Sequence, residues 1–133
     1  MSDLVVFDTN AFVSYFWPSV KISAARISVD RMMDGKAIPV FSTATMSEYV
    51  DVLNRKKFNF SHHEICCFLD SIIKNGYRVS PVPTLVHFTD ASDKCFYDAA
   101  VAAGCWLVTG NKRHYPDEPF VVSPREWLNL LGL

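Results

Sequence analysis

The chain has 133 residues, of which 50% are hydrophobic and 20% are charged, and its formal net charge is -1. This length and composition predict one globular domain over residues 1–133 and exclude a disordered chain. The balanced charge excludes a uniformly basic nucleic-acid binder, so any attraction for nucleic acid must come from local patches.

No stretch of about 20 apolar residues is present, so the sequence predicts no membrane span. The N-terminal segment also lacks the layout of a secretory signal peptide, because Asp3 and Asp8 interrupt its apolar run. We therefore expect a cytoplasmic protein that makes no contact with a membrane.

Strand and helix patterns alternate along the first part of the chain. Leu4–Phe7 is a short apolar run typical of a buried strand, and later segments show helical spacing of apolar residues. Ser61 and Glu64 have the spacing of a helical capping box. The expected elements are a strand at 4–7, a helix at 23–35, a strand at 37–41, a helix at 42–56 and a helix at 61–75.

The second part of the chain continues the alternation. Pro81 and Pro83 limit any strand within 77–86 to a short or edge strand. Ser123-Pro124 has the form of a helix cap followed by proline in the first helical position. The remaining expected elements are a helix at 89–103, strands at 105–108 and 120–122, and a closing helix from 123. This alternation predicts an α/β fold, a single-domain α/β/α sandwich with a mainly parallel central sheet.

Acidic side chains fall where such a sheet places its ligands. Ligands bind at the carboxyl ends of parallel strands, near the point where strand order reverses. Asp8 follows the first strand, Asn111 follows the strand at 105–108, Glu48 lies in the helix after the second strand, and Asp93 opens the helix at 89–103. Clustered carboxylates repel one another unless a cation lies among them, and oxygen ligands suit Mg²⁺ or Mn²⁺. The pattern therefore predicts a divalent metal site.

Several stretches, in this order, resemble the PIN domain family over essentially the whole chain. They are "VVFDTNAFVS", the glutamate in "MSEYVDVL", "DASDKCFYDAAVAAGCWLVTGNKRHY" and "PREWLNLL". The nearest type is the toxin-like prokaryotic branch, the VapC-like ribonuclease toxins. The resemblance implies a Mg²⁺- or Mn²⁺-dependent endoribonuclease that hydrolyses RNA phosphodiester bonds with metal-activated water. It also implies the toxin role of a toxin–antitoxin system, an antitoxin protein as partner, and a homodimer.

The resemblance assigns roles to individual positions. Asp8, Glu48 and Asp93 match the catalytic, metal-binding acids, while Asn10 and Thr109 match polar residues that flank the site. Family members usually carry an aspartate at the position of Asn111, where an amide could bind metal through its oxygen but brings no charge.

Two further acids could support the site. Asp90 suits the N-cap of the following helix or a supporting role in the acidic pocket. Asp98 could supply charge, although it lies about 140° round the helix from Asp93.

Two basic clusters are candidates for contact with RNA. Lys112, Arg113 and His114 follow directly on the expected site, so they could contact phosphate or form a solvated face. Arg55, Lys56 and Lys57 form the other cluster, for which a solvated face is the simpler interpretation.

Two other functions remain open at this point. Asn111 is compatible with a catalytically weak or inactive PIN-fold module that binds RNA or another protein. An aspartate that ends the first strand also occurs in phosphatases of the haloacid dehalogenase type, but those enzymes generally carry a second aspartate where this chain has Asn10.

The four cysteines show neither a disulfide framework nor zinc spacing. Cys66, Cys67, Cys95 and Cys105 contain no Cys-x-x-Cys pair and lie in apolar surroundings. We expect them to be small buried thiols in a reducing compartment.

Overall fold

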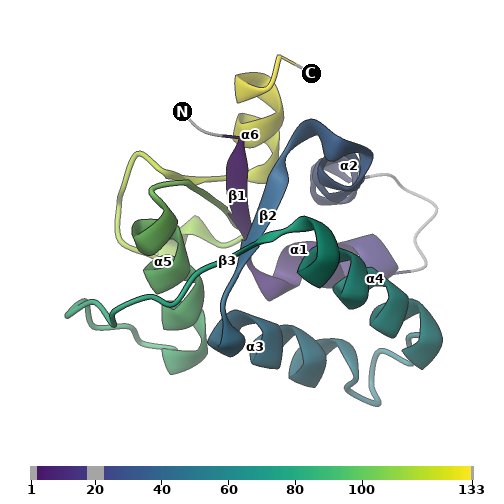
Figure 1. Cartoon of the computed structure of the whole chain (residues 1–133). Helices are drawn as coiled ribbons and strands as arrows, with labels where there is room; N and C mark the ends of the chain where they lie inside the picture. The colour runs from purple at the N-terminus through teal and green to yellow at the C-terminus, as the bar shows by residue number, and fades with distance from the viewer. Residues whose placement is uncertain (1–2, 18–22, 133) are drawn as a thin grey trace.

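The computed structural model describes residues 3–17 and 23–132 (Figure 1). Within these residues the chain forms one five-stranded sheet in the order β3-β2-β1-β4-β5, and every neighbouring pair is parallel. The strands are β1 Leu4–Phe7, β2 Ile38–Phe41, β3 Tyr77–Arg78, β4 Trp106–Val108 and β5 Val121–Val122. The parallel sheet confirms the predicted α/β class.

Six α-helices connect and cover the strands of the described chain. They are α1 Thr9–Phe16, α2 Ala24–Arg31, α3 Thr43–Leu53, α4 His62–Asn75, α5 Ala91–Ala103 and α6 Pro124–Leu130. Two short helical turns, η1 Met32–Lys36 and η2 Lys112–His114, complete the order. Figure 1 shows α5 on one side of the strands and α1, α2 and α4 on the other, which confirms the three-layer arrangement.

β1 lies at the centre of the sheet, between β2 and β4. Val5 pairs with Pro39 of β2 and Val6 pairs with Leu107 of β4. Val5, Val6 and Phe7 are all buried, because helices cover both faces of this strand. The chain leaves β1 for β2 on one side and returns to β4 on the other, so the order reverses beside β1. The carboxyl end of β1 is therefore a topological switch point.

The polar side chains expected to start helices do so. Ser42 and Thr45 form a reciprocal capping box at α3, and Ser123 with Glu126 does the same at α6. At α4 the Ser61 hydroxyl accepts a hydrogen bond from the Glu64 N–H, but the reciprocal bond from the Glu64 side chain that a capping box requires is not formed. Gly104 ends α5 in a left-handed conformation with φ of 62°, which a residue without Cβ adopts at little cost. These local interactions explain why helix positions could be predicted well.

The structure differs from the sequence prediction in two places. α1 starts directly after β1, where we expected no helix, because Asp8 serves as its N-cap and leaves no loop between strand and helix. The expectation of buried thiols was wrong for Cys66 and Cys67, which are exposed on α4. Their neighbours Ile65 and Phe68 face the core instead.

No helix in the described part of the chain is long and apolar enough to span a bilayer.

Candidate active site

A cavity of about 200 Å³ opens at the carboxyl end of β1. Its walls are formed by residues of α1, α3, α5 and η2, which are far apart in sequence. The residues that line it are Asp8, Thr9, Asn10, Glu48, Val52, Arg55, Asp90, Ser92, Asp93, Phe96 and His114. The fold thus brings Asp8, Glu48 and Asp93 to one cavity at the switch point.

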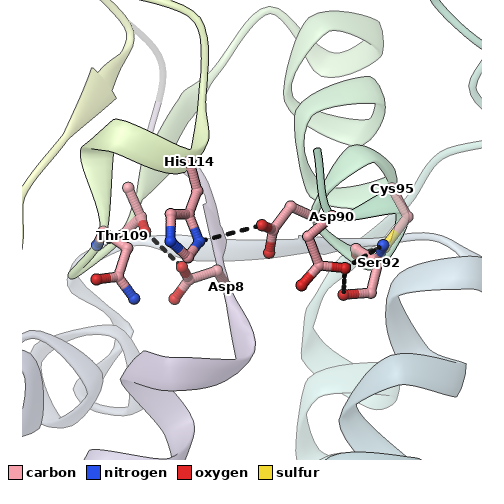
Figure 2. Close-up of polar contacts among 8 residues, drawn as sticks. Asp8, Asp90, Ser92, Cys95, Thr109 and His114 are labelled. Atoms are coloured by element: carbon pink, nitrogen blue, oxygen red, sulfur yellow. Dashed lines mark hydrogen bonds and ion pairs between the residues drawn. The ribbon is translucent and has the colours of Figure 1, made fainter. Parts of the chain in front are cut away.

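Asp8 is the most deeply placed acid of this cavity, with only 3% of its surface exposed. One carboxylate oxygen, Oδ1, accepts a hydrogen bond from the Ala11 N–H at 3.3 Å, and Oδ2 accepts one from the Thr109 hydroxyl (Figure 2). The pKa of Asp8 is raised from 3.8 to about 6, mainly by burial and to a smaller extent by the nearby Asp93, and the hydrogen bonds from Thr109 and Ala11 oppose the shift. The chain therefore holds a carboxylate in a place that disfavours its charge.

Thr109 connects the ends of β1 and β4. It is fully buried, and its hydroxyl donates to Asp8 while accepting a hydrogen bond from the Asn111 N–H at 2.9 Å. Its own N–H donates to the Val122 carbonyl at 3.0 Å. Because these backbone contacts fix the Thr109 hydroxyl, the Asp8 carboxylate is held in one orientation.

Asp93 lies in the first turn of α5 and faces His114 of η2. The Asp93 Oδ2 and His114 Nδ1 atoms are 3.3 Å apart. This Oδ2 is buried, yet among the described residues it has no hydrogen bond of good geometry. Burial and the neighbouring Asp90 raise the pKa of Asp93, while His114 lowers it. Buried polar atoms are usually satisfied, so this carboxylate oxygen is an exception.

Glu48 approaches the cavity from α3 and is half-buried. Burial raises its pKa, and Asp51, Asp90 and Asp93 add to the shift, whereas Arg55 opposes it. Three acids at this cavity, Asp8, Glu48 and Asp93, thus share one electrostatic signature: each is harder to ionise than a free side chain. Such shifts cluster at functional sites.

Asp90 behaves differently from these three acids. It caps α5, and its Oδ1 accepts hydrogen bonds from the Ser92 N–H at 3.0 Å and the Ser92 hydroxyl at 2.7 Å (Figure 2). These bonds lower the pKa of Asp90, so it keeps its charge at the rim of the cavity. Asp90 therefore has both of the roles that the sequence left as alternatives: it is the N-cap of α5, and it lines the acidic cavity.

Four other candidate residues lie outside the cavity wall. Asp98 accepts hydrogen bonds from the Thr84 hydroxyl at 2.6 Å and from Lys94 Nζ at 2.8 Å. The bond to Thr84 attaches the segment before α5 to this helix. The backbone of Asn111 contacts Thr109, but its side chain is not part of the lining. Lys112 pairs with Glu126 at 3.0 Å, and Arg113 is exposed. Of the basic cluster Lys112–His114, His114 alone lines the cavity.

Sequence reasoning did not assign Thr9, Val52, Ser92 and Phe96 to the site. Val52 follows Glu48 at the i+4 helical spacing and Phe96 follows Asp93 at i+3, so both share a helix face with an acid. That spacing could have identified them. Arg55, also on the Glu48 face, was considered only as part of a basic cluster.

A family model of the PIN domain matches residues 4–113. The chain belongs to the PIN domain family. The match includes Asp8, Glu48 and Asp93, and it favours this assignment over a phosphatase of the dehalogenase type. A comparison with curated proteins found no match. PIN domains have a nuclease-type fold, are typically hydrolases of nucleic acid, and generally use divalent metal ions.

The acids of this PIN domain do not form a complete metal cage by themselves. Within residues 3–17 and 23–132, no group of three or more His, Cys, Asp or Glu side chains is close enough to hold one ion directly. Mg²⁺, however, keeps several waters and commonly uses only one or two carboxylates. A cavity of about 200 Å³ has room for an ion with such waters. The crowded acids and the open Asp93 Oδ2 therefore fit a hydrated divalent ion.

Proposed function

We propose that this PIN protein is a metal-dependent endoribonuclease that acts as the toxin of a toxin–antitoxin system. The observation that carries the proposal is the meeting of Asp8, Glu48 and Asp93 at one cavity, where each has a raised pKa. Bringing such groups together costs stability, and a bound cation would offset that cost. Membership of the PIN family supports RNA as the substrate.

The residues of the cavity would have different roles toward a bound metal ion. A bound Mg²⁺ or Mn²⁺ would supply activation of water and neutralisation of phosphate charge. Asp8 provides the rigid oxygen ligand, because Thr109 and Ala11 hold its carboxylate. Asp93 and Glu48 provide oxygens from two other elements, and Asn10 lies at the same rim.

The basic cluster Lys112–His114 supports a binding position for the RNA backbone. His114 lies at the cavity, while Lys112 and Arg113 stand beside it on η2 and are exposed. Their positive charge would attract phosphate groups next to the cleaved bond. An antitoxin protein that covers this cavity, and a homodimer, complete the proposal.

Purified protein is expected to cleave RNA in Mn²⁺ and to stop when the metal is chelated. Glu48→Gln, which removes one charge and keeps the side-chain shape, should lower the rate by about 10²-fold or more. At limiting Mn²⁺ the rate should also fall as the pH drops through about 6, because a proton on Asp8 competes with the ion. A gel assay with labelled RNA over a pH series measures both effects.

Glu118→Gln is the matched control for Glu48→Gln. Glu118 is also half-buried but lies outside the acidic cavity. The control variant should cleave RNA at the rate of the unmodified protein. Cleavage that persists in chelator, or an equal loss in both variants, would contradict the proposed mechanism.

A second candidate function is an RNA-binding or interaction module with little or no catalysis. Two observations favour it: position 111 carries an amide, and no three-ligand group forms among the described side chains. Both imply a weaker hold on metal than a fully acidic site would have.

Asn111→Asp tests how position 111 acts. A carboxylate two residues beyond Thr109 adds negative charge near Asp8, so we expect Mn²⁺ to bind roughly tenfold more tightly. Isothermal titration with Mn²⁺ measures this, with Asp117→Asn as a control for surface charge. Unchanged affinity would show that position 111 does not influence the ion.

A further inference from the structure

Two histidine–cysteine pairs lie on the exposed surface of α4, away from the acidic cavity. Cys66 follows His62 by one helical turn, and Cys67 follows His63 in the same way. The Nε2 and Sγ atoms are 3.6 Å apart in the first pair and 3.7 Å apart in the second. Residues four apart share one face of a helix, which is the spacing by which helices present two ligands to one metal ion.

The nitrogen–sulfur separations match the geometry of zinc. In a tetrahedral site, Zn–S is about 2.3 Å and Zn–N about 2.0–2.1 Å, which places the two ligand atoms about 3.6 Å apart. Both pairs have this separation without any change of side-chain conformation. Thiolate and imidazole also favour zinc, whereas the oxygen ligands of the acidic cavity favour magnesium or manganese.

Asn54 distinguishes the first pair from the second. The Asn54 Nδ2 group donates to the Val50 carbonyl at 2.8 Å, so its oxygen faces His62, where Oδ1 and Nδ1 are 2.9 Å apart. In the neutral imidazole, His62 Nδ1 then donates to Asn54, which leaves Nε2 as the acceptor that faces Cys66. Histidines that bind metals are commonly held by such an outer hydrogen bond. In the described structure, His63 has no comparable partner on its Nδ1.

We propose that His62 and Cys66 bind a zinc ion, and that a second copy of the chain supplies the same two ligands. A tetrahedral ion needs four ligands, and the described part of one chain brings no third His, Cys, Asp or Glu to the pair. The thiol proton passes to solvent as the zinc–sulfur bond forms, and the Nε2 lone pair makes the second bond. Ile73, 49% exposed, lies on the same face of α4 and provides apolar surface for the second copy.

Cobalt titration of the reduced full-length protein tests the site directly. Co²⁺ bound by Cys66 gives a thiolate charge-transfer band, which carboxylate ligands cannot produce. We expect the band in the unmodified protein, its displacement by Zn²⁺, and a stoichiometry of one zinc for two chains. The homodimer proposed above is the assembly that this zinc ion joins, so light scattering should show the molar mass doubling from monomer to dimer when Zn²⁺ is added to chelator-treated protein.

Matched variants on the same helix separate the two pairs. Cys66→Ser and His62→Gln should lose the cobalt band, while Cys67→Ser should keep it with the affinity changed by less than about threefold. All three positions are exposed, so circular dichroism should show the same helix content in each variant. Equal losses in Cys66→Ser and Cys67→Ser, or metal binding without the thiolate band, would overturn the site.

Asn54 acts as a positioning residue, and its variants provide a separate readout. Asn54→Ala should weaken zinc binding by about tenfold. Asn54→Asp, which still accepts a hydrogen bond from His62 Nδ1, should restore the affinity. No change in Asn54→Ala would refute the role of the outer hydrogen bond. One zinc per monomer, with no change in mass, would refute the part played by a second copy.

Discussion

Replacing Asp8 with asparagine is expected to abolish metal-dependent RNA cleavage and, at neutral pH, to stabilise the fold. The loss of rate should be at least about 10²-fold, because the variant lacks the buried oxygen charge at the centre of the cavity. The gain in stability follows from burial: Asp8 is ionised at pH 8 in a place where its pKa is about 6.

The stability difference should depend on pH in a defined direction. The pKa of Asp8 rises from 3.8 to about 6 on folding, so the folded chain binds the proton more tightly than the unfolded chain. The stabilising contribution of the protonated group is complete below pH 4 and is lost as the pH rises through 6. The amide that replaces the carboxyl group does not ionise, so Asp8→Asn should gain up to about 3 kcal/mol over the original chain at pH 8 and little at pH 3.5.

Urea unfolding at pH 3.5 and pH 8 measures this difference. Mn²⁺ should raise the stability of the unmodified protein at pH 8 and leave Asp8→Asn unchanged, since a ligand stabilises only the state that binds it. Asp34→Asn, an exposed partner of Arg31, is a suitable control and should show neither effect. If Asp8→Asn were less stable than the original chain at every pH, burial of the ionised Asp8 carboxylate would not lower the free energy of unfolding as proposed.

Trp127→Ala is expected to destabilise the domain by about 3–5 kcal/mol. Trp127 lies in α6, beyond the end of the family match at residue 113, yet it is 1% exposed. Its ring packs at right angles to that of Phe7, the last residue of the strand before Asp8, at a centroid distance of 5.4 Å. Removing it leaves a cavity beside β1, so the orientation of Asp8 should loosen as well.

Leu130→Ala on the same helix is the control for Trp127→Ala. Leu130 is 56% exposed, and its truncation should change the unfolding free energy by less than about 1 kcal/mol. Urea denaturation of both variants gives the comparison. If Trp127→Ala cost no more than Leu130→Ala, α6 would not be part of the core that supports the site.

The positions of most elements could be predicted from sequence because local interactions set them. Ser42, Ser61 and Ser123 start helices through hydrogen bonds to residues three positions later. The apolar run before Asp8 indicated a strand buried on both faces, and β1 is that strand. α1 was not predicted because its N-cap, Asp8, directly follows the strand and leaves no loop to mark the start of a helix.

The candidate acids could be named from sequence, but their environment could not. Asp8, Glu48 and Asp93 were expected at one end of the sheet because parallel strands point their carboxyl ends the same way. The sequence could not show that Thr109 orients Asp8, that His114 faces Asp93, or that Asp98 is engaged by Thr84 and Lys94. Some of these contacts join segments whose separation depends on how the whole chain packs. Others depend on which of several nearby side chains becomes the partner.

By itself, the sequence determined the alternation of strands and helices, because helix caps and apolar periodicity act over a few residues. The tertiary structure alone decided which side chains are buried, and with them the raised pKa of Asp8 and the exposure of Cys66 and Cys67. Burial depends on surfaces contributed by remote parts of the chain. Two of the four thiols expected in the core, Cys66 and Cys67, therefore lie outside it, where the geometry of His62 and Cys66 suits a metal ion.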